Sequence, residues 1–176
     1  KLKPQDRRFL LKKVEILERL NRPEEALALC RTALEKDPED PDILLKAAAL
    51  ALHLWRLGDA VEYYHKVLLS RPRLLEALEG KLEALEKLDR IPEAVQVIDR
   101  ILEVSPQAVA MHRKKVFHLQ KLDFREDETL QAIEEALPHF PEDIELLSLK
   151  ARLLFLRKRL EEALAIYEKI LKPDPS

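Results

Sequence analysis

The sequence has few of the residues that build disulfide-stabilised or β-rich proteins. Its 176 residues include one cysteine, Cys30, and two glycines, Gly58 and Gly80. One cysteine excludes an internal disulfide framework, and two glycines supply little of the turn chemistry that tight β-hairpins need. No apolar run approaches the ~18 residues that span a bilayer. We therefore expect an all-α protein without a membrane span, and the lone thiol fits a reducing compartment such as the cytoplasm.

The chain also lacks an excess of charge of either sign. It has 31 Lys and Arg residues against 33 Asp and Glu residues, which leaves a net charge of −2. Such a balance gives no field that would attract nucleic acid, an anionic membrane or a strongly basic partner. With 36% charged and 47% hydrophobic residues, the composition indicates a helical core with charged faces and selects no ligand.

Residues that carry catalysis or bind metals are scattered. No two of the five histidines have the spacing of a helical zinc site; they are His53, His65, His112, His118 and His139. Two glycines cannot form a phosphate-binding loop, and the four serines form no nucleophile motif. Cys30 falls on an apolar stripe, so we expect it in the core rather than as a nucleophile. The sequence predicts no enzyme, no cofactor and no metal site.

The main signal is a repeat marked by five prolines. They are spaced by 34, 34, 35 and 34 residues and are Pro38, Pro72, Pro106, Pro141 and Pro175. Twelve residues before each proline stands a small or short residue: Ala26, Ala60, Ala94, Thr129 and Ala163. A period of this length indicates one supersecondary unit stacked on its copies. We expect a single repeat domain over residues 1–176, with repeats at approximately 7–40, 41–74, 75–108, 109–143 and 144–176.

Each repeat divides into two helices at a polar or proline-marked break. Pro23 and Pro92 suit the first turn of a helix, where the missing N–H costs nothing. The second helices are thus predicted to begin near residues 23, 58, 92, 127 and 160. In the first helices an apolar stripe at helical spacing predicts core residues, namely Leu10, Val14, Leu17 and Leu20, and in the third repeat Leu78, Leu82, Leu85 and Leu88.

The second-helix stretches RPEEALALCRTALEKDP, GDAVEYYHKVLLSRP, PEAVQVIDRILEVSP and LEEALAIYEKILKPDP resemble the tetratricopeptide repeat family. The fourth repeat departs from the pattern by Thr129 at the small position and one extra residue after Asp123. The resemblance implies an all-α, right-handed α-solenoid of about five helix-turn-helix hairpins, hence about ten antiparallel helices. It also implies that the first helices line a concave groove that holds a peptide or protein segment.

The resemblance assigns the groove to one face of each first helix. The candidate peptide-binding residues on that face are Leu11, Lys12, Glu15, Leu45, Lys46, Ala49, Glu79, Gly80, Glu83, Arg113, Lys114, Phe117, Ser148 and Arg152. One interpretation is an elongated ligand of mixed charge, with a basic residue against Glu79 and Glu83 and an acidic one against Arg113 and Lys114. The alternative is that opposite charges on neighbouring helices pair with each other or are simply solvated.

Three groove residues have a second explanation. Gly80 within a helix costs roughly 0.5–1 kcal/mol relative to alanine, so it is explained either by close approach of a ligand backbone or by sequence drift. Phe117 and Phe155 are candidate apolar anchors, but burial against a neighbouring helix is the commoner fate of such residues and is what we expect.

Two functions remain open at this point. The first is a non-catalytic scaffold that binds a protein or peptide partner in the groove. The second is a self-associating structural array, either a fragment of a longer solenoid or a designed protein, that assembles through uncapped ends, the C-terminal end in particular. Nucleic acid is disfavoured, because the acidic first helix of the third repeat would repel phosphates; its carboxylates are Glu76, Glu79, Glu83 and Glu86.

Overall fold

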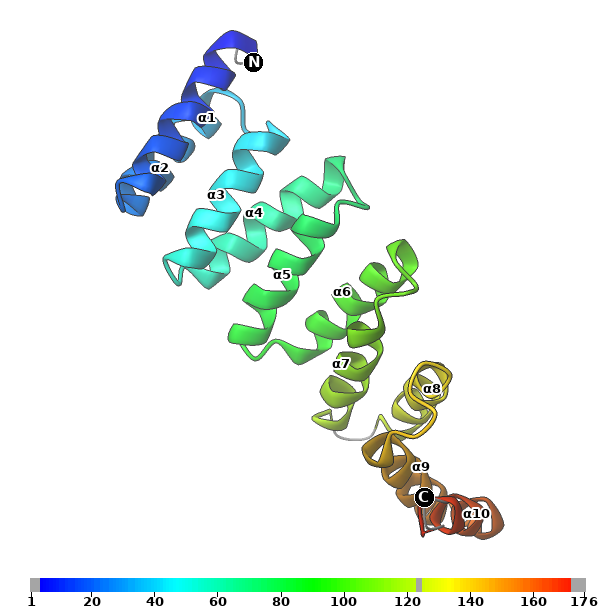
Figure 1. Ribbon diagram of the computed structural model, residues 1–176. Helices are drawn as coiled ribbons and strands as arrows, with labels where there is room; N and C mark the ends of the chain where they lie inside the picture. Colours follow the sequence, from blue (N-terminus) through cyan, green and yellow to red (C-terminus); the bar gives the residue numbers. More distant parts are fainter. Residues whose placement is uncertain (1–3, 123–124, 172–176) are drawn as a thin grey trace. The chain divides into compact units, whose positions relative to one another are not determined.

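The computed structural model describes residues 4–122 and 125–171, which contain ten α-helices and no strand (Figure 1). The helices are α1 Pro4–Arg19, α2 Pro23–Lys36, α3 Pro41–His53, α4 Leu57–Ser70, α5 Leu75–Lys87, α6 Ile91–Val104, α7 Val109–Gln120, α8 Glu126–Ala136, α9 Ile144–Leu156 and α10 Leu160–Leu171. Every second helix begins within one residue of its predicted start. The predicted turn at Asp123 lies outside the described residues.

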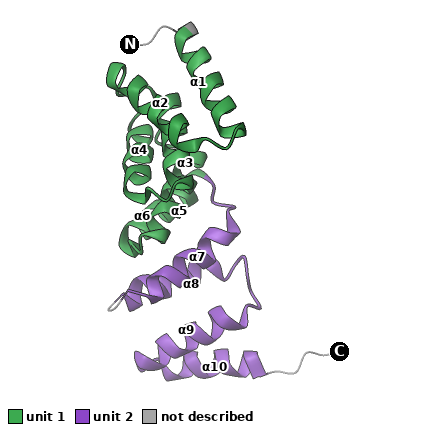
Figure 2. Ribbon diagram, turned by 90° about the vertical axis from the view of Figure 1, so that its left-hand side faces the viewer, with its two compact units in different colours: residues 1–104 green, residues 105–176 purple. Residues whose placement is uncertain are grey.

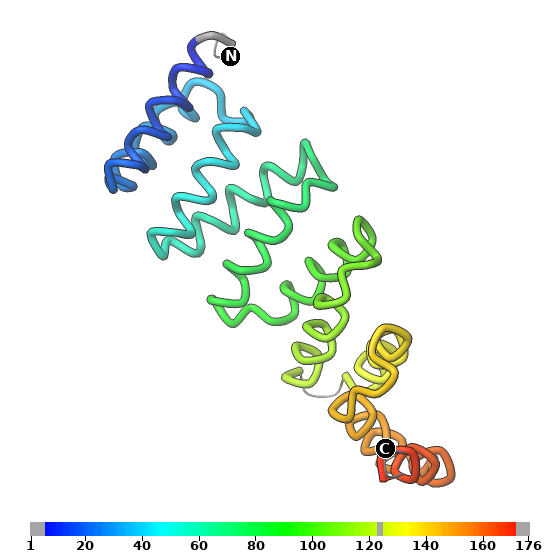
Figure 3. Tube along the Cα trace, viewed as in Figure 1, coloured from blue at the N-terminus to red at the C-terminus, as the bar shows by residue number. Residues whose placement is uncertain are grey.

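The chain forms two compact units, residues 1–104 with α1 to α6 and residues 105–176 with α7 to α10 (Figure 2). Within each unit the trace reverses direction from one helix to the next, so neighbouring helices are antiparallel (Figure 3). Each first helix packs against the second helix of its own repeat, and α3, α5 and α9 also pack against the second helix of the preceding repeat. The fold is an all-α helical-hairpin array. The single-domain organisation and the repeat boundaries stay predictions.

The same backbone turn closes α1, α3, α5 and α9. The second residue after each helix has a positive φ, with values of 55° at Asn21, 57° at Trp55, 55° at Asp89 and 60° at Lys158. The next N–H donates to a carbonyl five residues earlier; for example, the Arg56 N–H bonds the Ala51 carbonyl at 2.8 Å. This is the Schellman arrangement, which satisfies the last carbonyls of a helix. The sharp reversal of each hairpin is therefore encoded in a few local residues.

An arginine precedes every second helix and its carbonyl accepts the first hydrogen bond of that helix. In four repeats the guanidinium also pairs with a glutamate three residues later, at 2.5 to 2.8 Å; the pairs are Arg22–Glu25, Arg90–Glu93, Arg125–Glu128 and Arg159–Glu162. In the second repeat, Asp59 pairs with Arg31 of the preceding second helix instead. The glutamates lie in the first helical turn, where the helix dipole also favours negative charge.

The core contains the small residues that the repeat pattern singled out. Each is at most 4% exposed, and they are Ala26, Ala60, Ala94, Thr129 and Ala163. The first-helix stripe is buried at Val14, Leu78, Leu82 and Leu85. The core prediction is wrong for Leu20 and Leu88, which are 58% and 37% exposed. Both follow the last residue of their helix, so helical spacing no longer places them over the core.

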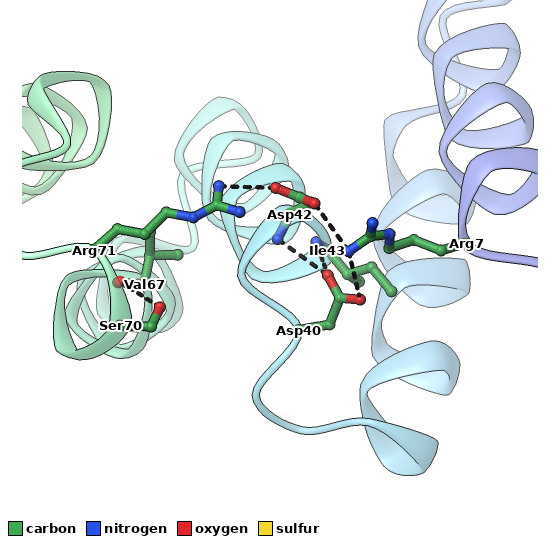
Figure 4. A network of polar contacts seen from close by, with 7 residues as sticks. All are labelled: Arg7, Asp40, Asp42, Ile43, Val67, Ser70 and Arg71. Atoms are coloured by element: carbon green, nitrogen blue, oxygen red, sulfur yellow. Dashed lines mark hydrogen bonds and ion pairs between the residues drawn. The ribbon is translucent and has the colours of Figure 1, made fainter. Parts of the chain in front are cut away.

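Aspartates cap two first helices and connect them to their neighbours. Asp40 accepts hydrogen bonds from the backbone N–H groups of Asp42 and Ile43 at 3.1 and 3.2 Å, which satisfies free donors at the start of α3. Arg7 of α1 and Arg71 after α4 reach Asp42 from opposite sides, at 3.1 and 2.8 Å (Figure 4). This network ties the first two repeats together at one end of their helices.

Among the described residues, no helix combines the length and the apolar character that crossing a bilayer requires.

Candidate functional site

The first hollow lies in unit 1, on the faces that the first helices α1, α3 and α5 present side by side. Residues three and four apart share one face of a helix, which is why the predicted positions converge there. The hollow measures about 400 Å³ and is lined by Arg8, Leu11, Lys12, Glu15, Asp42, Leu45, Lys46, Ala49 and Glu76. The structure thus brings together all six candidate residues of the first two repeats.

Lys12, Glu15, Asp42 and Lys46, which line this hollow, each have an ion-pair partner. Glu15 accepts from Lys12 at 2.7 Å and from Arg19 at 2.9 Å, and the hydrogen bond from Lys12 lowers the pKa of Glu15. Lys46 of α3 pairs with Glu18 of α1 at 2.9 Å. Pairing between charges of the same or adjacent helices, the second interpretation of the sequence, therefore applies here. Leu11, Leu45 and Ala49 provide the apolar part of the lining.

A second hollow in unit 1 shares Ala49 with the first. It measures about 340 Å³ and is lined by Ala49, Leu52, His53, Trp55, Tyr64, Glu83 and Lys87. Trp55 is 69% exposed, and the Lys87 ammonium lies 4.5 Å from the centre of its ring, a cation–π distance. Lys87 also pairs with Glu83 at 3.5 Å. An exposed aromatic ring therefore stands beside the predicted recognition residue Glu83.

Gly80 and Glu79 line none of these hollows. A Cβ built on Gly80 would overlap the ring of Tyr64, coming within 2.8 Å of its Cε1 atom. The backbone of α5 therefore approaches the tyrosine of α4 closely, and only glycine leaves room for that ring. This packing explains Gly80 without a ligand. Glu79 is exposed on the same helix.

Unit 2 has its own hollow between α7 and α9, with a contribution from α10. It measures about 670 Å³ and is lined by Arg113, Lys114, Val116, Phe117, Gln120, Glu145, Leu146, Ser148, Leu149, Arg152 and Tyr167. All five candidate residues of the fourth and fifth repeats are among them. Three of the five carry positive charge and one is aromatic.

Arg113 has structural partners of its own. Its guanidinium lies 3.2 Å from Asp143, which caps α9, and 3.5 Å from Glu145 in the first turn of that helix. It also lies over the ring of Phe140, 5.3 Å from the centre. Arg113 therefore joins α7 to the start of α9, and an acidic ligand would have to compete with these carboxylates. Arg152 is exposed on the opposite wall of the hollow.

The prediction that Phe117 and Phe155 are buried is wrong. Their side chains are 57% and 61% exposed, because Val116 and Leu154 beside them occupy the core positions of α7 and α9. Phe117 lines the hollow of unit 2, and the Lys121 ammonium lies 4.8 Å from its ring centre. Phe117 is thus available as an apolar anchor for a ligand, whereas the sequence favoured its burial against a neighbouring helix.

Sequence reasoning missed three aromatic residues that line the hollows, Trp55, Tyr64 and Tyr167. Trp55 belongs to a turn, and Tyr64 and Tyr167 belong to second helices, so a search restricted to first-helix positions passes over all three. The available signal was the composition itself, because Trp55 is the one tryptophan of the chain and tryptophan is enriched at binding hot spots.

The described residues contain no group of three or more His, Cys, Asp and Glu side chains that could hold a metal ion. Cys30 is fully buried, as predicted, and desolvation raises the pKa of its thiol to about 11. A thiol that stays protonated at neutral pH is a poor nucleophile.

Comparison with protein-family models identifies the repeat. One tetratricopeptide repeat model matches residues 7–50, and a second matches residues 45–109 and 127–176. No curated protein sequence gives a match.

Solved structures share the fold across nearly the whole chain. TTC0263, a thermophilic TPR protein in Thermus thermophilus, is 27% identical with a TM-score of 0.51, covering 96% of this chain and 92% of its own. MamA from Desulfovibrio magneticus RS-1 is 19% identical with a TM-score of 0.62 and coverages of 94% and 93%. YrrB, described as a TPR protein with an unusual peptide-binding site, is 18% identical with a TM-score of 0.65 and coverages of 94% and 86%.

Proposed function

Because the chain belongs to the tetratricopeptide repeat family, we propose that it is a non-catalytic scaffold that binds a peptide or protein segment on its first-helix faces. One observation carries the proposal: candidate residues from different repeats line common hollows. Leu11 and Leu45 meet in unit 1, and Phe117 and Arg152 meet in unit 2. Concave sites with an apolar lining and a few polar groups are the usual form of binding sites.

The two units favour ligands of different chemistry. In unit 1 Lys12, Glu15 and Lys46 have ion-pair partners, so the apolar patch of Leu11, Leu45 and Ala49 provides the affinity for an apolar side chain. In unit 2 the exposed Arg152 adds positive charge to the hollow that Phe117 lines, which suits an acidic residue beside an apolar one. This division revises the mixed-charge ligand inferred from sequence, because Arg113 already has acidic partners.

The test for unit 1 is a selection of random peptides on the immobilised full chain, followed by affinity measurements with two matched variants. Ala49 lines both hollows of unit 1, so Ala49→Arg fills them with a long side chain at little cost in helix propensity. Ala28 is exposed on α2 and lines neither hollow, so Ala28→Arg is the control. We expect Ala49→Arg to weaken peptide binding about 10-fold or more, which corresponds to ~1.4 kcal/mol.

The control should bind like the wild type. Selected peptides that bind the wild type, Ala49→Arg and Ala28→Arg equally well would show that the first-helix hollows of unit 1 are not the binding site. Arg152→Glu applies the same reasoning to unit 2, where acidic peptides should lose affinity and Lys158→Glu, at an exposed position on the following turn, should not reduce it.

A second candidate function is self-association through the C-terminal end. The observation that favours it is the apolar surface of α10, where only Ala163 is buried among the described residues. Molar mass measured against protein concentration tests it, and a monomer at all concentrations would exclude it.

A further inference from the structure

The outer face of α10 carries the residues that neighbouring repeats cover elsewhere. Leu164 and Tyr167 are 58% and 39% exposed. The residues at the same repeat positions in α2, α4 and α8 are at most 7% exposed and are Leu27, Val61 and Leu130, and Cys30, Tyr64 and Ile133. Each of these three helices packs against the first helix of the following repeat. The exposed face of α10 therefore carries apolar residues at the positions that, in α2, α4 and α8, pack against a first helix.

The outer face of α1 shows the converse. Phe9 and Ile16 are 67% and 56% exposed. At the same repeat positions α3, α5 and α9 carry residues that are at most 6% exposed, namely Ile43, Ala77 and Leu146, and Leu50, Ala84 and Leu153. These helices pack against the second helix of the preceding repeat. The exposed face of α1 therefore carries apolar residues at the positions that, in α3, α5 and α9, pack against a second helix.

An ion pair inside unit 2 shows how charges cross such a contact. Lys150 of α9 pairs with Glu134 of α8, the preceding second helix, at 3.2 Å. The same repeat positions are occupied by Lys13 on the outer face of α1 and by Glu168 on the outer face of α10, and both side chains are exposed. The two ends of the chain are thus complementary in charge as well as in apolar surface.

We infer that α10 of one copy packs against α1 of a second copy, with Lys13 of one chain paired to Glu168 of the other. This inference rests on the second candidate function and is independent of peptide binding. The contact joins two different surfaces, so each bound copy leaves one end open and growth continues to longer chains. Apolar burial supplies the affinity, and the ion pair fixes the register.

The experiment measures molar mass against concentration by sedimentation for the wild type and three variants of equal helicity. Ile16→Glu blocks the α1 face and Leu164→Glu blocks the α10 face. Leu69→Glu is the control, because Leu69 is 72% exposed on α4, which is neither of the two end helices. We expect the wild type and Leu69→Glu to grow beyond dimers, while Ile16→Glu and Leu164→Glu each stay monomeric. An equal mixture of the two end variants should form dimers that do not grow, since it contains one intact pair of faces.

The ion pair is tested by charge reversal. Lys13→Glu or Glu168→Lys alone should weaken association about 3- to 10-fold, and the two changes in one chain should restore it. If Ile16→Glu associates like the wild type, self-association stands but the head-to-tail contact is refuted. If the wild type is monomeric throughout, both fail. If Leu69→Glu is as defective as the end variants, the end faces are not the contact.

Discussion

The second helices α4 and α10 have similar sequences in different surroundings. Both place alanine, a branched residue, tyrosine and leucine at the same spacing, as Ala60, Val61, Tyr64 and Leu68 in α4 and Ala163, Leu164, Tyr167 and Leu171 in α10. In α4, which packs between α3 and α5, all four are buried, whereas α10 buries the alanine alone. The apolar pattern of a second helix therefore predicts which of its faces a neighbouring helix can cover. Whether that face is buried in the core or exposed as a binding surface depends on whether the neighbouring helix is present.

The largest expected difference in stability between the two helices comes from removing the tyrosine that they share, Tyr64 in α4 and Tyr167 in α10. Tyr64 is 4% exposed and Tyr167 is 39% exposed. Truncating a buried aromatic residue removes its burial and leaves a cavity, so Tyr64→Ala should lower the free energy of unfolding by about 3–5 kcal/mol. Tyr167→Ala should lower it by less than about 1 kcal/mol. Urea denaturation followed by circular dichroism measures both, and equal losses would show that α10 is packed as tightly as α4.

A smaller effect on the free energy of unfolding is expected from the titration of Cys30, which occupies in α2 the repeat position of Tyr64 and Tyr167. Desolvation by burial raises the pKa of the Cys30 thiol from 9.0 to about 11. The folded state thus favours the protonated thiol, and the stability that results is complete below pH 9 and is lost as pH rises from 9 to 11. At ~1.4 kcal/mol per pKa unit, the loss is roughly 2–3 kcal/mol.

The variant Cys30→Ala isolates this contribution, although the smaller side chain lowers stability at every pH. Its free energy of unfolding should fall less steeply than that of the wild type between pH 9 and 11. Identical slopes in the two proteins would mean that Cys30 does not titrate later in the folded state than in the unfolded state.

The smallest effect sharpens the comparison by testing a feature that does not depend on neighbours. Lys158, in the turn before α10, has a φ of 60°, a conformation that glycine adopts without strain. Lys158→Gly should therefore raise the free energy of unfolding by about 0.5–1 kcal/mol, even though the helix that follows is covered on one side only. Lys158→Ala, which keeps the Cβ, should give no such gain in the same denaturation experiment.

The sequence predicted what depends on local residues. The break before Pro23 and the proline period place every second helix to within one residue, because turns and helix starts are determined by residues close in the chain. Exposure was predicted less well. Phe117 and Leu20 are exposed because their surroundings depend on where a helix ends and which helix lies beside it. The periodicity of the sequence indicates neither where a helix ends nor which helix lies beside it.

The candidate site shows the same division. The family resemblance, which assigns the groove to one face of the first helices, predicted that Leu11 and Leu45 belong to one site, and both line the same hollow. It missed Trp55, whose position depends on a left-handed turn, and it offered no reason to connect Gly80 with Tyr64, which lies on another helix.

The arginine that starts each second helix has a consequence for how this family of sequences can change length. At Arg22, Arg90 and Arg159 the turn residue, the arginine and its glutamate partner are adjacent in the sequence, so the signals for that hairpin are carried together. Duplication or deletion of a stretch as long as the proline spacing, 34 residues, that spares these three hairpins leaves each of them with its complete set. A deletion of a few residues between the turn and the glutamate removes part of that set. Whole repeats are therefore the unit by which such genes can lengthen or shorten without loss of the fold.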